Sequence, residues 1–277
     1  MPGTPVVFVH GAWFHALCWE AWAQRFTARG FTVVAPGWPG ELPTADEARR
    51  RPDRLPDLGL AALTEHFTGV VGSFDSPPVL IGHSVGGLIV QRLLAAGLGR
   101  AAVAIASAPI NGVPLPGPLA ALGMPPCAGS AEPSTESPAG RPEAQLALSG
   151  GQFRQLFANT SDEREAAELY ERYAVPAPRR LITEVGAGGR SELTAVDVGR
   201  RARGPLLLIS GQEDLLVPDA VTRAVYKQYG DSAAVTELKQ FADRSHTLFV
   251  DSGWRPVADH VLDWLARQDI RADRPGS

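Results

Sequence analysis

Residues 78–96, PVLIGHSVGGLIVQRLLAA, decide the fold of this chain. Their apolar start, 78–81, predicts a buried strand, and residues 86–96 have the apolar spacing of a helix. Between them stands Gly-His-Ser-Val-Gly, with Ser84 at its centre. A serine in a glycine-flanked turn from strand to helix is typical of a nucleophile elbow, because the turn has no room for β-carbons and the hydroxyl projects above the sheet. An ordinary helix N-cap serine is the alternative interpretation.

Strands and helices alternate on both sides of this segment. Runs rich in β-branched and other apolar residues predict further strands at 5–9, 31–35, 101–106, 205–209 and 235–241. Apolar residues at helical spacing predict further helices at 19–26, 58–74, 219–229 and 254–267. Regular alternation of this kind predicts an α/β fold, in which a mostly parallel sheet is covered by helices on both faces.

The alternation lapses between residues 110 and 203. Residues 127–142 are rich in Pro, Ser and Gly and predict a loop. Residues 152–159 and 161–173 predict two helices, and Ser161 is the predicted cap of the second. We therefore expect a core made of residues 1–109 and 204–277, with residues 110–203 inserted as a helical cap or lid. A polar stretch at 41–57 predicts a separate surface excursion.

Composition excludes several classes of function. The 277 residues include 26 basic and 30 acidic ones, and no basic cluster stands out, so no nucleic-acid partner is expected. Neither of the two lysines follows a glycine-rich turn, which excludes a P-loop. Two cysteines, Cys18 and Cys127, are too few for a thiolate metal site. We predict no metal and no cofactor.

Neither a signal peptide nor a transmembrane helix is expected from the residue pattern. No run reaches 18 apolar residues, and residues 1–13 have no basic region followed by an apolar one. We therefore expect a cytoplasmic protein with no membrane association. The sequence makes no prediction of its oligomeric state.

A serine hydroxyl needs a base within hydrogen-bond reach to become a nucleophile. Among six histidines, we choose His246, because it lies in a loop just after the last predicted strand. Loops at the carboxyl ends of parallel strands surround the functional crevice of such sheets. The remaining histidines suit turns, helix ends or packing: His10, His15, His66, His83 and His260.

The histidine in turn needs an acid to orient it. The loop after the predicted strand 205–209 contains both Glu213 and Asp214, and either could serve. We favour Asp214. The order Ser84, Asp214, His246 is the nucleophile–acid–base order that follows a nucleophile elbow. Asp243, close to His246, is interpreted as an ordinary loop residue.

An oxyanion formed at the serine needs two fixed N–H donors. The backbone amide of Val85, directly after Ser84, is the expected first donor. The second is expected from the loop after the first strand. We choose the amide of Ala12 there, with Trp13 as the alternative.

The motifs VVFVHGAW, GHSVGG, SGQEDLLVP and RSHTLF together resemble the α/β-hydrolase superfamily, over about residues 5–267. The start, HGAWFHALCWEAW, is similar to the small serine esterases related to plant methylesterases and hydroxynitrile lyases, and to bacterial hydrolases. The resemblance implies the same site. Ser84, Asp214 and His246 would form the triad, Ala12 and Val85 would be the oxyanion donors, and residues 110–203 would form the cap.

Two departures narrow the expected activity. Ser84 stands where haloalkane dehalogenases and most epoxide hydrolases carry aspartate, and Thr247 stands where plant cyanohydrin lyases carry lysine. We predict a serine hydrolase that cleaves a small apolar carboxylic ester or lactone through an acyl-enzyme. Hydrolysis of a C–C bond or cofactor-free perhydrolysis on the same triad are alternatives. A ligand-binding protein without catalysis is another.

Large apolar side chains near these motifs and in the cap segment predict an apolar substrate pocket. The predicted substrate-binding residues are Trp13, Phe14, Trp38, Met124, Phe153 and Phe157. Plain packing is the alternative interpretation for each of them.

Overall fold

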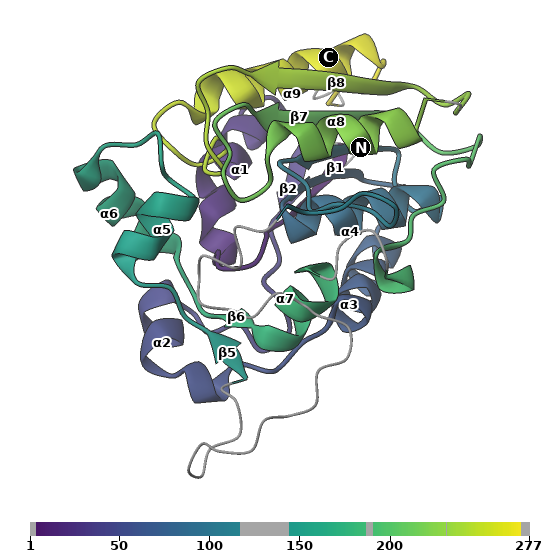
Figure 1. Ribbon diagram of the computed structural model, residues 1–277. Helices are drawn as coiled ribbons and strands as arrows, with labels where there is room; N and C mark the ends of the chain where they lie inside the picture. The colour runs from purple at the N-terminus through teal and green to yellow at the C-terminus, as the bar shows by residue number, and fades with distance from the viewer. Residues whose placement is uncertain (1–3, 117–143, 187–190, 231, 273–277) are drawn as a thin grey trace.

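A six-stranded sheet runs through the protein (Figure 1). The computed structural model describes residues 4–116, 144–186, 191–230 and 232–272. The strands of this sheet are β1 (Pro5–Val9), β2 (Thr32–Val34), β3 (Val79–His83), β4 (Ala101–Ile105), β7 (Leu206–Gly211) and β8 (Thr236–Phe241). They lie in the order β2-β1-β3-β4-β7-β8, and every neighbouring pair is parallel. The predicted α/β fold with a mostly parallel sheet is confirmed.

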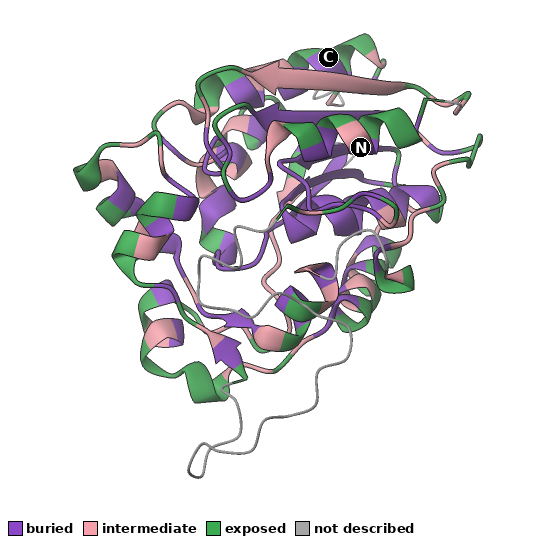
Figure 2. Cartoon of the chain, viewed as in Figure 1, coloured by how far each residue is buried: buried purple, intermediate pink, exposed green. Residues whose placement is uncertain are grey.

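Helices cover both faces of this sheet. The helices of the described residues are α1 (Glu20–Thr27), α2 (Ala45–Arg50), α3 (Leu60–Gly72), α4 (Val85–Ala95), α5 (Gly150–Leu156), α6 (Glu163–Tyr173), α7 (Arg179–Gly186), α8 (Asp219–Gln228) and α9 (Trp254–Arg267). Short 3₁₀ helices stand at Ala16–Trp19, Pro52–Arg54 and Glu192–Thr194. The inner strands β1, β3, β4 and β7 are buried along their whole length, whereas β8 at the edge is half-buried (Figure 2). Burial on both faces is the usual condition of a parallel sheet.

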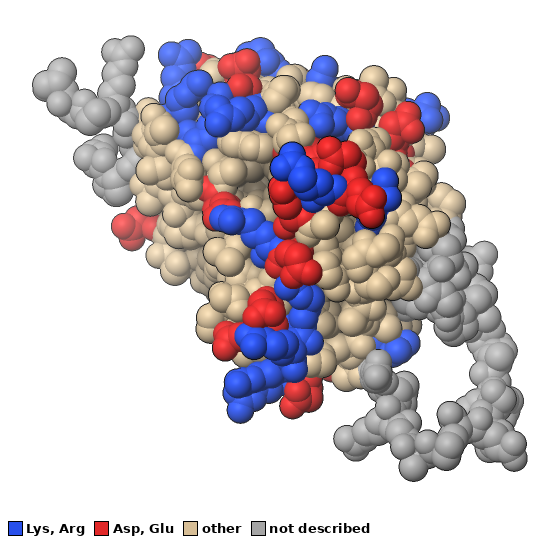
Figure 3. All heavy atoms as spheres, turned by 90° about the vertical axis from the view of Figure 1, so that its left-hand side faces the viewer, with Lys and Arg blue, Asp and Glu red and all other residues tan. Residues whose placement is uncertain are grey.

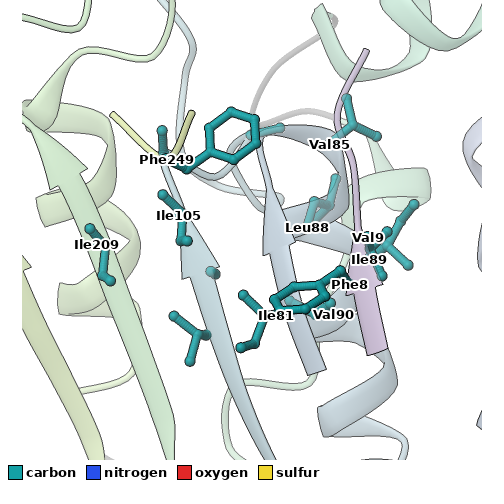
Figure 4. Close-up of a cluster of buried hydrophobic side chains, with 14 of the residues drawn as sticks. Phe8, Val9, Ile81, Val85, Leu88, Ile89, Val90, Ile105, Ile209 and Phe249 are labelled. Carbon is teal, nitrogen blue, oxygen red and sulfur yellow. The ribbon is translucent and has the colours of Figure 1, made fainter. Parts of the chain in front are cut away.

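Apolar side chains from the inner strands and α4 form the core. Figure 4 shows part of it, with Phe8, Ile81, Ile105 and Ile209 on neighbouring strands and Leu88 on α4. All of these side chains are fully buried. Each buried apolar side chain of this size contributes about 1.5–3 kcal/mol relative to exposure. The core therefore holds the carboxyl ends of the strands in place, and this fixes the points at which the following loops begin.

The described residues of the segment 110–203 include three short helices, α5, α6 and α7. α5 and α6 pack on each other, and a capping box at Ser149 begins α5. The segment also holds a two-stranded antiparallel pair, β5 (Gln145–Leu146) and β6 (Ala177–Pro178), which the sequence did not predict. The predicted cap at Ser161 is wrong by one residue. Asp162 caps α6, because its carboxylate accepts a hydrogen bond from the amide of Glu165.

The polar stretch at 41–57 is more ordered than a surface excursion. The hydroxyl of Thr44 accepts from the amide of Glu47 and starts α2. Ala45 and Ala48 are buried, and α2 packs on α6. The charged residues around them hid this helix, because its apolar face consists of two alanines.

Basic and acidic side chains alternate on the face formed by α2 and α6 (Figure 3). Ion pairs on this face include Arg50–Asp46, Arg164–Glu168 and Arg172–Glu20. Exposed pairs of this kind add little stability, but they leave no broad area of one sign on this face. Among the described residues, no helix has both the length and the apolar character needed to cross a membrane.

Candidate active site

Ser84 lies in a strained turn between β3 and α4. Its backbone has φ 55° and ψ −119°, a combination that residues other than glycine rarely adopt. A β-carbon at Gly82 would collide with the carbonyl oxygen of Gly86, and one at Gly86 would collide with the carbonyl oxygen of Val9. The two glycines are therefore what allows β1, β3 and the start of α4 to meet at Ser84. The turn has the shape expected of a nucleophile elbow.

Asp214 and His246 meet at the carboxyl ends of β7 and β8. Oδ2 of Asp214 lies 2.7 Å from Nδ1 of His246, and both side chains are fully buried. Oδ1 accepts hydrogen bonds of 2.8 Å from the amides of Leu216 and Val217. Both oxygens of the carboxylate thus face donors, which fixes the orientation of the imidazole. Of the two acids left open by the sequence, Glu213 is exposed and Asp214 makes the contact.

The other ring nitrogen of His246 is free. Nε2 is buried and has no hydrogen-bond partner among the described residues. A buried histidine with one nitrogen on a carboxylate and the other unoccupied is oriented to exchange a proton with a neighbouring group.

His83 joins the Ser84 turn to the loop of His246. Its Nε2–H donates to the carbonyl oxygen of His246 at 3.0 Å, and its ring stacks on Phe249 with centroids 4.0 Å apart. Burial, together with the nearby His246, lowers the pKa of His83 well below its usual value. The ring is therefore neutral near pH 7 and acts as a fixed donor, in agreement with a turn-stabilising role.

Ser84 lines a pocket of about 370 Å³. The predicted oxyanion donors Ala12 and Val85 line the same pocket, and so does Trp13. The amide of Val85 has no acceptor within α4, because the first amides of a helix lack an intrahelical partner. The other lining residues described are apolar: Ala108, Leu115, Ile182, Val185, Gly186, Leu216 and Val217.

The predicted substrate-binding residues lie in different places. Trp13 lines the Ser84 pocket, whereas Trp38 stacks on His10 in a second pocket of about 390 Å³, which Phe14 also lines. Phe14, Phe153 and Phe157 are fully buried and pack on one another, with ring centroids 5.2–5.8 Å apart. Each of these three rings contacts the other two, so they form one packed cluster, and their role in substrate binding stays a prediction. Met124 lies outside the described residues.

Most of the residues that line the Ser84 pocket were not predicted from the sequence. Ile182 and Val185 come from α7, and their spacing with Leu181 is the only local signal that this short helix has an apolar face. Leu216 and Val217 lie two and three residues after Asp214, so their amides orient the acid while both residues line the pocket.

A half-buried glutamate, Glu41, also contacts the residues around the predicted oxyanion loop. Glu41 lies 3.2 Å from Nε2 of His10 and 3.6 Å from Nε2 of His15, the two residues that flank the loop. Burial raises the pKa of Glu41, but its hydrogen bond with His10 and the charges of both histidines lower it by more. Glu41 is therefore ionised near neutral pH and holds both ends of the loop.

Backbone hydrogen bonds tie residues 157–175 to the loops around the site. The amide of Val175 donates to the carbonyl of Trp13, and the amide of His15 donates to the carbonyl of Tyr173. The amide of Thr247, next to His246, donates to the carbonyl of Phe157. The oxyanion loop and the histidine loop are thus both anchored to this segment. Among the described residues, no three or more His, Cys, Asp or Glu side chains are arranged so that they could hold a metal ion.

The sequence profile of the alpha/beta hydrolase family matches residues 6–260. The chain belongs to this family. In this α/β hydrolase, the match covers every strand of the large sheet except the first residue of β1, together with the site described above. No curated protein sequence matches it significantly.

Solved structures show the same fold at low sequence identity. A methylesterase, MES16, from Arabidopsis is 16% identical with a TM-score of 0.64, over 95% of this chain and 99% of its own. An extracellular alpha/beta-hydrolase from a Paenibacillus species is 18% identical with a TM-score of 0.66, over 94% and 98%. A monoacylglycerol lipase from Paleococcus ferrophilus is 19% identical with a TM-score of 0.65, over 95% and 94%.

Proposed function

We propose that this α/β hydrolase is a serine esterase or lactonase that cleaves small apolar substrates through an acyl-enzyme. Ser84 is the nucleophile, His246 the base and Asp214 the acid that orients it. The observation that carries the proposal is the 2.7 Å contact between Asp214 and His246, which leaves Nε2 of the buried imidazole free. The strained turn at Ser84 supplies a matching nucleophile.

In the first half of the reaction, Nε2 of His246 takes the hydroxyl proton of Ser84 while Oγ bonds to the carbonyl carbon of the substrate. The amides of Val85 and Ala12 stabilise the resulting oxyanion, each by about 2.7–4 kcal/mol of barrier. The tetrahedral intermediate then collapses. His246 returns the proton to the leaving oxygen, which departs as an alcohol and leaves an ester on Ser84.

In the second half, His246 removes a proton from a water molecule as the water oxygen bonds to the acyl carbon. The second collapse releases the carboxylic acid and returns the proton to Oγ of Ser84. In a lactone, the leaving alcohol stays attached to the acyl group, so one hydroxy acid is released.

The pocket supports an apolar substrate. Apart from Ser84, the described residues that line it carry apolar side chains or none, so a charged group there would lose its hydration without a partner. The methylesterase and the lipase among the structures of the same fold are named for the hydrolysis of esters.

Labelling with a fluorophosphonate, read by peptide mass spectrometry, tests the nucleophile. We expect a covalent adduct on Ser84 in the parent protein and none in Ser84→Ala. Ser73→Ala, which removes an exposed hydroxyl at the end of α3, is the matched control and keeps the adduct. A parent protein without an adduct on Ser84 would contradict the proposal.

A substrate panel then tests the reaction class. We expect turnover of p-nitrophenyl esters or lactones with apolar acyl groups, and loss of that turnover in Ser84→Ala. Turnover confined to β-diketones would point to C–C bond hydrolysis on the same residues and would refute the ester assignment.

A further inference from the structure

Trp13 separates the Ser84 pocket from another pocket. The second one, of about 480 Å³, is lined by Trp13, Arg49, Pro52, Ala147, Leu148, Tyr170, Ala174, Val175 and Pro176. Trp13 is the single residue that both linings share in the part of the chain that the structure describes. Trp13 therefore stands between the nucleophile and this adjoining space, which we call the outer pocket.

Several contacts fix the indole in this position. Its Nε1–H donates to the carbonyl oxygen of Leu146 at 2.9 Å, and its ring meets Phe157 edge-on with centroids 5.7 Å apart. The carbonyl of Trp13 accepts from the amide of Val175, and the residue is only 4% exposed. The backbone is held at φ 63°, a conformation that persists in a bulky residue only when the surroundings enforce it. The wall is therefore rigid.

The outer pocket suits an apolar group. Most of its lining is formed by proline, alanine, valine and leucine side chains. Its one charged residue, Arg49, already donates to the carbonyl oxygens of Tyr170, Ala174 and Glu171. Since the guanidinium is engaged by the protein, an alkyl chain fits this space better than an anionic group.

We propose that Trp13 is a specificity-determining residue that sets the length of the substrate chain. The ring stops a chain that starts at Ser84 from reaching the outer pocket, so the parent enzyme favours short esters. A smaller side chain at position 13 joins the two pockets and admits longer ones. This inference rests on the proposed esterase function and names the substrate group which that site selects.

The test measures kcat/KM for two series of esters. One series lengthens a linear acyl chain from two to twelve carbons on p-nitrophenol, and the other lengthens a linear alcohol on acetate. The proteins are the parent, Trp13→Ala, the milder Trp13→Leu, and Trp254→Ala as the matched control. Trp254 is a half-exposed tryptophan at the start of α9.

We expect both substitutions at position 13 to move the optimum toward longer chains in at least one series, chiefly through a lower KM. Each additional methylene that becomes buried is worth about fourfold. Two more methylenes therefore change the ratio of kcat/KM for long over short esters by roughly 15-fold. Trp254→Ala keeps the parent profile. The series that shifts identifies whether the acyl or the alcohol group lies against Trp13.

A uniform loss at every chain length would overturn the inference, because it would show that Trp13 only supports the fold. Unchanged profiles in both series would overturn it as well. Fluorophosphonate labelling of Ser84 and thermal melting are measured on each variant, so that a folded, labelled variant with an unchanged profile refutes Trp13 alone. A parent that is neither labelled nor active refutes the esterase proposal and this inference together.

Discussion

Asp214 and Asp251 are two buried carboxylates in the loops that follow the last two strands, and their hydrogen-bond donors are arranged differently. As whole residues, Asp214 and Asp251 are 3% and 2% exposed. Asp214 receives donors on both oxygens: two backbone amides on Oδ1 and Nδ1 of His246 on Oδ2. On Asp251, both the amide of Gly253 and the guanidinium of Arg244 contact Oδ1.

The pKa of Asp251 differs from that of an exposed aspartate. The pKa of Asp251 is raised from 3.8 to about 6, because burial raises it by more than the nearby Arg244 and the amide of Gly253 lower it. The acidic residues Glu165 and Asp243 raise it a little further. Equal burial therefore produces different roles: Asp214 orients a histidine, whereas Asp251 binds a proton in the weakly acidic range.

The largest effect on activity is expected from Asp214→Asn, which removes the carboxylate that contacts His246. An amide at this position no longer holds His246 in the tautomer that leaves Nε2 free to accept a proton. We expect kcat to fall by about 10⁴, with the fold retained. Ester turnover measures it, and Glu213→Gln, which changes the exposed neighbour, is the matched control. If both variants lose activity equally, Asp214 is not the acid.

Part of the fold and of the candidate site could be predicted from short stretches of sequence. β3, α4 and the turn at Ser84 were predictable because each has its signal within a few adjacent residues. Asp214 and His246 follow from a simple rule, since side chains just after neighbouring parallel strands share one edge of the sheet.

The pocket wall was not predictable in the same way. Phe153 and Phe157 have the size expected of lining residues, yet they face Phe14 and are fully buried. Ile182 and Val185 line the pocket instead. A sequence shows that a side chain is apolar but not which of two apolar environments covers it, because that depends on contacts between distant segments.

A moderate effect is expected from Asp251→Asn, and it appears in stability rather than activity. The folded protein holds its proton up to about pH 6, whereas the unfolded chain releases it near 3.8. The parent therefore loses stability as the pH rises between these values, by up to about 3 kcal/mol. Asparagine does not titrate in this range. The free energy of unfolding of Asp251→Asn, relative to that of the parent, should therefore rise from pH 4 to 6 and then stay constant.

Urea unfolding at pH 4, 5, 6 and 7 measures this difference. Asp243→Asn, which neutralises an exposed acid of the same loop, is the control and should show a much smaller change with pH. Curves for Asp251→Asn that stay parallel to the parent from pH 4 to 7 would show that Asp251 is ionised throughout.

The smallest effect concerns the side chains that reach the two loops from residues 150–175. Nδ2 of Asn159 donates to the carbonyl of Glu213, beside Asp214, whereas the carboxylate of Glu165 accepts from the amide of Ser252, beside Asp251. Loss of one such bond costs about 0.5–1.5 kcal/mol. We expect both Asn159→Ala and Glu165→Ala to lower the melting temperature slightly, but only Asn159→Ala to lower kcat, by a few-fold. Equal values of kcat in the two variants would contradict a link between Asn159 and the acid.

The backbone bonds that join Trp13, His15 and Thr247 to residues 157–175 have a consequence for how this enzyme can evolve. Because main-chain groups make them, they survive most replacements of the side chains involved. Mutations along this segment can therefore reshape the surroundings of the site one residue at a time while the catalytic loops stay in register. Within this segment, Tyr170, Ala174 and Val175 line the outer pocket, so their side chains can change while these backbone bonds remain.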